Sequence, residues 1–270
     1  MSFWGPITTS TATQLGAGYA GLMPHLADLL PTLAALAILV ALTVGVLWGS
    51  RTPQYLAPAV AILRGAAQLA LISLILGGII SDPLWVGAAL LVMFSVAATT
   101  AARRLGWSWH RFAVVAGTMA LGITVTLGVV FATDAIEFTP RYVLAVGGIV
   151  IGNCMTIAVL AGRRFYEAVN EQWDQVEGWL ALGATAGVAT LAQARQSVHS
   201  ALIPSTDQTK TTGLVTLPGA FVGAIFGGAS PLEAGRFQVV VLASIMAAGS
   251  VTAVVLLRSL RGVKVRPAVP

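Results

Sequence analysis

The sequence predicts an all-α, polytopic membrane protein with seven transmembrane helices. Of its 270 residues, 57% are apolar and 9% are charged, and the mean hydropathy is +0.86. Soluble domains carry about 25% charged residues, so this chain is too apolar to be one. Several stretches also reach the roughly 20 apolar residues that a helix needs to cross a bilayer. We expect a single transmembrane domain over residues 1–270, located in the inner or plasma membrane of the cell.

Seven spans are expected, and charged residues, proline or glycine mark their ends. The sixth is short and interrupted by Pro218-Gly219, which predicts a bent or discontinuous helix. Residues 179–192 are apolar but only 14 in number, and a stretch of that length is typical of an interfacial or packed helix. The expected spans are residues 26–48, 57–80, 84–102, 112–132, 142–161, 213–228 and 237–257.

The positions of Lys and Arg predict an external N-terminus and an internal C-terminus. With this orientation twelve of the fifteen basic residues lie inside, two lie outside, and Arg64 lies within a span. The chain has a net charge of +5, but its basic residues stand at span ends rather than among aromatic residues, so no nucleic-acid interface is expected. Cys154 is the single cysteine, which excludes an internal disulfide and any multi-cysteine metal site.

A long polar stretch at residues 163–213 predicts a cytoplasmic helical hairpin between the fifth and sixth spans. Its first helix continues the fifth span, because apolar residues recur there at intervals of three and four. Gly183 is expected to end that helix and Thr185 to cap a second one, which Pro204 ends. Such a hairpin either packs on its own bundle or offers a surface to a cytoplasmic partner.

Several residues are candidates for a solute path within the membrane. Arg64 and Gln68 share one face of the second span, and an intramembrane charge indicates a functional site unless it only ties helices together. Asn153, Cys154 and Met155 are either metal ligands or, the preferred interpretation, packing and interhelical bonding groups. The metal, if any, stays unknown. The predicted path comprises Arg64, Gln68, Asn153, Cys154, Met155, Pro218 and Gly219.

Residues 201–238 resemble the iron-exporting permease family of ABC transporters, whose plant relatives are linked to aluminium tolerance and proposed to move UDP-glucose. The stretch is ALIPSTDQTKTTGLVTLPGAFVGAIFGGASPLEAGRFQ. The pair Arg64 and Gln68 and the Gly152-Asn153 dipeptide also fit this family, so the resemblance covers most of the chain from the second span onward.

A second resemblance concerns the polar stretch, which is similar to the loop by which ABC permeases dock their ATPase. It implies that the hairpin couples the permease to that partner. The candidate coupling residues are Glu177, Gly183, Arg195, Ile203 and Pro204.

Sequence motifs for nucleotide binding or catalysis are missing. The chain has no G-x-x-x-x-G-K-[ST] loop, since Thr209-Lys210-Thr211 lacks the preceding glycines. It also has no arrangement typical of a hydrolase or metalloprotease. We therefore expect no enzyme activity and no cofactor bound by this chain, with ATP handled by a separate polypeptide.

These features together favour a permease subunit of an ABC transporter. It would form a homodimer, pair with a separate ATPase subunit, and export a metal ion such as iron or a small polar metabolite. The alternative is a secondary transporter driven by an ion gradient, for which carboxylates within the membrane would be expected. A membrane scaffold is a third class of function, but it would not explain Arg64 or the broken sixth span.

Overall fold

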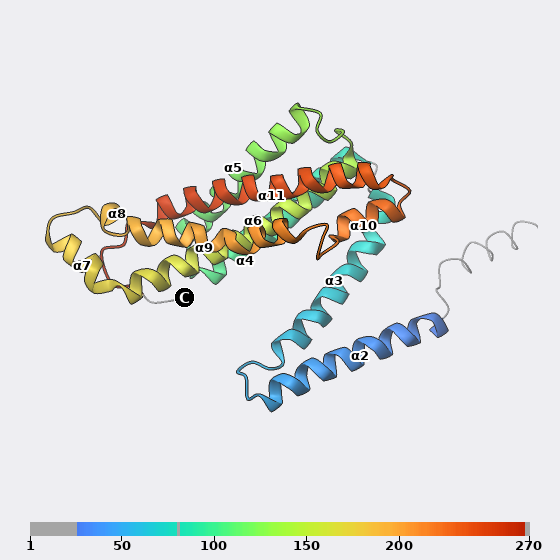
Figure 1. The fold of residues 1–270 in the computed structure, drawn as a ribbon, viewed down its shortest axis with the longest axis horizontal. Helices are drawn as coiled ribbons and strands as arrows, with labels where there is room; N and C mark the ends of the chain where they lie inside the picture. Colours follow the sequence, from blue (N-terminus) through green and yellow to red (C-terminus); the bar gives the residue numbers. More distant parts are fainter. Residues whose placement is uncertain (1–25, 80–81, 268–270) are drawn as a thin grey trace, which may run out of the picture. The chain divides into compact units, whose positions relative to one another are not determined.

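The computed structural model describes residues 26–79 and 82–267, and over these ranges the fold is all-α. The one β feature in the described part is an isolated bridge between Thr212 and Thr216. The helices are α2 (Leu26–Gly49), α3 (Ala57–Ile79), α4 (Pro83–Arg104), α5 (Trp109–Ala132), α6 (Pro140–Glu171), α7 (Trp173–Ala181), α8 (Ala186–Ala189), α9 (Leu191–Thr211), α10 (Gly219–Phe226) and α11 (Pro231–Leu260) (Figure 1). The predicted fold class is confirmed in this respect.

The chain forms two compact units, Met1–Gly77 and Gly78–Pro270. The first contains α2 and most of α3, and every residue there whose burial is described is exposed or half-buried. Apart from polar residues such as Arg64 and Gln68, these helices are apolar, as is typical of membrane helices. The second unit contains α4 to α11 and the apolar core. The prediction of a single membrane domain stays a prediction.

Helix starts in the second unit follow from local sequence. Asp82 caps α4, because its carboxylate accepts a hydrogen bond from the Leu84 amide at 2.9 Å, and Pro83 occupies the first turn. Ser108 caps α5 in the same way through the Arg111 amide. Ser230 and Glu233 form a reciprocal capping box at the start of α11. These caps fix where each long helix begins.

Small residues let the long helices of the second unit approach closely. A Cβ atom at Gly147 would lie 3.0 Å from a methyl group of Leu90 in α4, and one at Gly122 would lie 2.6 Å from the Ala248 carbonyl oxygen in α11. Gly147 in the fifth predicted span is therefore a close-packing site between two helices. The resulting core joins α4, α5, α6 and α11.

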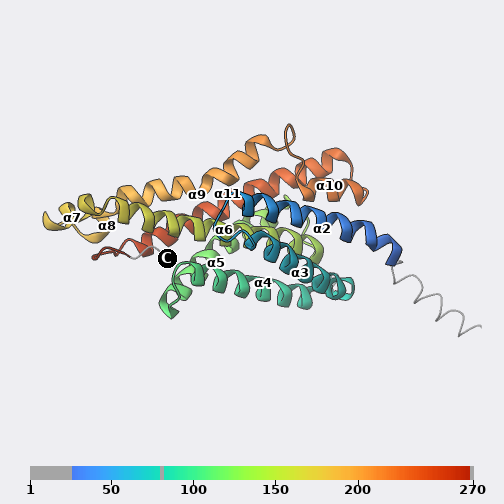
Figure 2. The ribbon, with the colours of Figure 1, turned by 90° about the horizontal axis from the view of Figure 1, so that it is seen from below.

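The directions of the helices follow from their contacts. The rings of Tyr142 and Phe237 lie 5.6 Å apart near the starts of α6 and α11, and Arg266 just beyond α11 reaches Asn170 near the end of α6. These two helices are therefore parallel. The helix α9 runs in the opposite direction, because Thr190 contacts Arg261 while Thr206 contacts Met246. Figures 1 and 2 both show α9 running alongside α6 and α11.

The hairpin differs from its prediction in the cap of its second helix and in where that helix ends. The fifth span does continue into the polar stretch, as α6 and then α7, and Gly183 forms the expected turn with φ +87°. Thr185 stands at the start of α8 but makes no side-chain cap. Pro204 was expected to end the second helix, and this is wrong, because α9 continues through it to Thr211. A proline costs a helix one hydrogen bond, and packing of α9 on α6 and α11 outweighs that loss.

The predicted sixth span is also not a membrane-spanning helix. Residues 213–228 hold α10, whose 8 residues rise only about 12 Å, against the ~30 Å of a bilayer core. Five described helices are long and apolar enough to cross a membrane, and α3 carries a shorter apolar stretch. The five are Leu30–Gly49, Pro83–Arg104, Trp109–Ala132, Pro140–Glu171 and Pro231–Leu260.

Candidate functional site

Arg64 and Gln68 lie one turn apart on α3, as predicted, and both side chains are exposed in the first unit. A charged group in a membrane helix costs about 2.5–3.5 kcal/mol near the bilayer centre. This face of α3 therefore favours water or protein over lipid. The role of the two residues in a solute path stays a prediction.

Asn153, Cys154 and Met155 belong to α6 and are engaged in packing. The Asn153 amide donates a hydrogen bond to the Ile149 carbonyl of its own helix at 2.9 Å. Cys154 is completely buried, and the Thr252 hydroxyl of α11 donates to its sulfur at 3.7 Å. Met155 packs against the apolar core. These contacts favour the packing interpretation. Over the ranges that the structure describes, no three His, Cys, Asp or Glu side chains are grouped to hold a metal ion.

Pro218 and Gly219 mark the start of α10, which packs on α11. Pro218 is in the extended conformation before the helix, with φ −63° and ψ 146°. The loop that precedes it exposes apolar residues, with Leu214 94% exposed. Pro218-Gly219 therefore separates two helices, α9 and α10, instead of bending one.

The structure separates the predicted coupling residues into two groups. Glu177 is exposed on α7, Gly183 forms the turn that follows, and Arg195 is exposed in the first turns of α9. Ile203 and Pro204 lie two turns further along α9. The neighbouring residue Leu202 approaches Gly249 in the middle of α11. Ile203 and Pro204 thus lie beside the apolar part of α11, away from the turn.

Residues 172–190, which we call the α7–α8 lobe, are tied to three long helices. The Gln193 amide of α9 donates to the side-chain oxygen of Gln172 at 2.8 Å. The Thr190 hydroxyl donates to the Arg261 carbonyl oxygen at 3.2 Å, which joins the lobe to the end of α11. Arg266 donates to the Asn170 side-chain oxygen at 2.6 Å, so the tail after α11 holds the end of α6. The lobe is a fixed extension of the bundle.

Sequence reasoning missed the exposed face of α9, a mainly polar stripe formed by Gln196, His199, Ile203, Asp207 and Lys210, which we call the polar stripe. These residues recur at intervals of three and four, so they share one side of the helix. The opposite side is buried on α6 and α11 by Gln193, Ala194, Ser197 and Ala201. The small residues at this spacing were the available signal for the buried side of α9.

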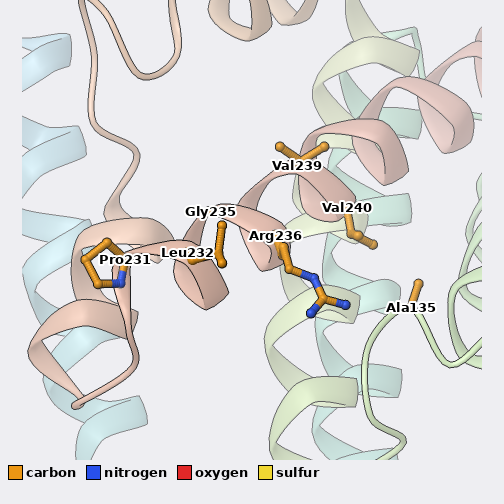
Figure 3. Close-up of a pocket in the computed structure, with 7 residues that line it drawn as sticks. All are labelled: Ala135, Pro231, Leu232, Gly235, Arg236, Val239 and Val240. Carbon is orange, nitrogen blue, oxygen red and sulfur yellow. The ribbon is translucent and has the colours of Figure 1, made fainter.

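An open groove lies beside the start of α11 (Figure 3). It encloses about 500 Å³. Figure 3 shows the guanidinium of Arg236 extending into the space between α11 and the loop that carries Ala135. A second hollow shares these two residues and adds the carboxylates of Glu137 and Glu233. No solute class is indicated by this groove, because it is shallow and Glu233 already forms the capping box of α11.

Comparison with known proteins places the chain among membrane proteins. The model of the family described as "Uncharacterised protein family (UPF0014)" matches residues 30–262. The chain is 39% identical over 196 residues to "UPF0014 membrane protein STAR2" of Oryza sativa subsp. japonica, covering 72% of this chain and 69% of that protein. It is 37% identical to "Protein ALUMINUM SENSITIVE 3" of Arabidopsis thaliana, covering 71% of each chain.

A bacterial relative carries a functional name. The chain is 34% identical over 137 residues to "Probable iron export permease protein FetB" of Escherichia coli (strain K12), covering 51% of this chain and 53% of that protein. No solved structure matches the chain. The matched family and its apolar helices make this a multi-pass membrane protein. The predicted resemblance is confirmed, and the chain belongs to the UPF0014 family of membrane proteins.

Proposed function

We propose that this chain is the membrane-spanning permease subunit of an ABC transporter in the cell membrane. It works as a homodimer with a separate ATPase and exports a metal ion, such as iron, or a small polar metabolite. The observation that carries this function is the α7–α8 lobe. It extends from α6, whose 32 residues are about 48 Å long and exceed the ~30 Å bilayer core. Movement of the lobe would be transmitted directly into the bundle.

The names of the relatives support the same function. One relative is named a probable iron export permease, and the family match covers residues 30–262 of this chain. Since the sequence has no phosphate-binding loop, ATP hydrolysis needs a partner chain. The exposed carboxylate of Glu177 and the exposed Arg195 provide a polar surface near the lobe for that partner.

The proposal is tested by isolating the full-length, tagged chain from its native membranes together with any bound ATPase. We expect the complex, once placed in liposomes, to hydrolyse ATP and to do so several-fold faster with one solute from a panel. The panel comprises iron(II), manganese(II) and a nucleotide sugar. The proposal is wrong if no ATPase is recovered and solute movement follows an imposed ion gradient instead.

A secondary transporter is the second candidate, and Asp207 is the observation that favours it. A carboxylate at the depth of the apolar middle of α11 is the type of group that ion-coupled transporters use. Asp207 already forms an ion pair with Lys210 at 3.2 Å, however, and both side chains are more than half exposed. The liposome experiment separates the two functions, because only an ABC permease requires ATP.

We further propose seven membrane crossings with the N-terminus outside and the C-terminus inside, in which α9 is the sixth crossing. Its 21 residues are about 31 Å long, and it runs antiparallel to α11. The polar stretch from residue 163 to 213 is then cytoplasmic only up to the start of α9. In this topology Lys210 lies outside, in contrast to the topology predicted from sequence. Eleven of the fifteen basic residues lie inside, in agreement with the positive-inside rule.

This topology predicts that cysteines placed at two exposed leucine positions are labelled from opposite sides of the membrane. Leu214 follows α9 and is 94% exposed, whereas Leu182 in the α7–α8 lobe is 83% exposed. In intact cells, a membrane-impermeant thiol reagent should label Leu214→Cys and leave Leu182→Cys unlabelled until the cells are opened. The unsubstituted chain is the blank, since Cys154 is buried. Labelling of Leu214→Cys only in opened cells would place α9 on the cytoplasmic side.

A further inference from the structure

The polar stripe of α9 lies at the depth of the membrane in the proposed topology. Leu202 approaches Gly249, and the Thr206 hydroxyl lies 4.0 Å from the Met246 sulfur. Both partners belong to the middle of α11, which is one of the helices able to cross a membrane. Since α9 is held there along its length, its exposed side cannot be placed in cytoplasmic water below the bilayer.

The same side is unsuited to lipid. It presents the imidazole of His199 and the ion pair of Asp207 and Lys210. Pro204 in the same turns has no N–H to offer the carbonyl of Ser200, so that oxygen needs another donor. Charged side chains and unpaired backbone carbonyls at membrane depth face protein or a water-filled cavity. The stripe therefore needs a cover that leaves its polar groups hydrated or paired.

A second copy of this chain fits that need. In a two-fold symmetric pair the same surface meets itself, so a stripe that carries both a carboxylate and an ammonium group is complementary to its own copy. In such a pair the two stripes, with His199 and Pro204, line the same seam.

We propose that the α9 stripes of two copies face each other across a water-filled path, and that this path carries the transported polar solute. The path thus follows Gln196, His199, Ile203 and Asp207. The path is therefore lined by α9, a helix that the sequence analysis placed in the cytoplasm. This inference rests on the proposed function only in assigning solute transport to the path.

The test compares two aliphatic residues at one depth in the bundle. Ile203 on the stripe is 43% exposed, and Leu121 on α5 is 46% exposed. Their depths match, because a Cβ atom at Gly122 would meet Ala248 of α11 and one at Gly249 would lie 3.7 Å from Leu202. The stripe is expected to face water and Leu121 to face lipid. Only in water does a thiol form the thiolate that reacts.

In liposomes, a charged methanethiosulfonate reagent should modify Ile203→Cys at least about tenfold faster than Leu121→Cys, because lipid suppresses the thiolate. A short bifunctional methanethiosulfonate should join two copies of the Ile203→Cys chain and leave the Leu121→Cys chain monomeric on a denaturing gel. The unsubstituted chain, with buried Cys154, should react with neither reagent.

Equal rates at the two positions would overturn a water-filled path at the stripe. Fast modification of Ile203→Cys without cross-linked pairs would overturn the second copy as its cover. Neither readout involves ATP. The water-filled path at the stripe and the ATPase partner are therefore tested independently, and either can fail without the other. A His199→Cys chain provides a second position one turn away on the same stripe, with the same expected results.

Discussion

Gly122→Ala is expected to destabilise the bundle, although alanine is the better helix former. A Cβ atom there would lie 2.6 Å from both the Ala248 carbonyl oxygen and the Thr252 hydroxyl oxygen. A backbone carbonyl cannot move aside as a flexible side chain can, so α5 and α11 must separate. Overpacking of this kind costs typically 1–3 kcal/mol. We expect a loss of about 2 kcal/mol, measured as a lower unfolding temperature of the purified protein in detergent.

The matched control is Gly128→Ala on the same helix. Nothing lies within 4 Å of the position that its Cβ would occupy, and the residue is exposed. Alanine is favoured over glycine inside a helix by about 0.8–1 kcal/mol, so this variant should be as stable as the parent or more so. Equal effects of the two substitutions, or a stabilised Gly122→Ala chain, would contradict the close contact between α5 and α11.

Sequence patterns predicted the long apolar helices well, because their ends are chemically marked. The expected span at residues 112–132 corresponds to α5 (Trp109–Ala132), and the one at 142–161 lies within α6. In these cases Ser108 or Pro140 starts the helix and an apolar run fixes its length. Hydropathy identifies such helices since their sides contact lipid or an apolar core.

The helix α9 could not be recognised by the same criterion. Its buried side uses small residues such as Ala194, Ser197 and Ala201, while its exposed side carries charges. Only its antiparallel packing on α11 supports the membrane depth that we propose for it, and that contact joins residues far apart in the sequence. The helix end predicted at Pro204 was wrong for a related reason. The rule that proline ends a helix describes only the local loss of a backbone hydrogen bond, and it leaves out the tertiary packing that offsets this loss.

The structure brings together only part of the predicted site. The turn at Gly183 follows from local chemistry and was found. The grouping of Ile203 and Pro204 with Glu177 came from the resemblance of the polar stretch to the loop by which ABC permeases dock their ATPase. The structure places the first two beside α11 and the third on the lobe. Cys154 illustrates the same limit, since only the fold shows that Thr252 contacts its sulfur.

Under the proposed function, Gly183→Val is expected to weaken binding of the ATPase without unfolding the membrane bundle. Gly183 ends α7 in a Schellman motif, in which its amide bonds to the Leu180 carbonyl at 3.0 Å and the Ala184 amide bonds to Trp179. Its φ of +87° is readily adopted by glycine and strained for a β-branched residue. Such strain costs about 1–3 kcal/mol, and it is relieved if the turn opens and α8 shifts.

A shifted α8 would displace Thr190 from Arg261 and so change the surface that we assign to the partner. Each 1.4 kcal/mol of lost docking energy weakens binding about tenfold, so binding of the ATPase by Gly183→Val should fall by at least about that factor. Co-purification with the ATPase and hydrolysis in liposomes measure the effect. Gly178→Val is the matched control, because Gly178 is an exposed residue inside α7 with nothing within 4 Å of its Cβ position. If Gly183→Val retains the partner as well as this control does, then the ATPase binds elsewhere than on the α7–α8 lobe.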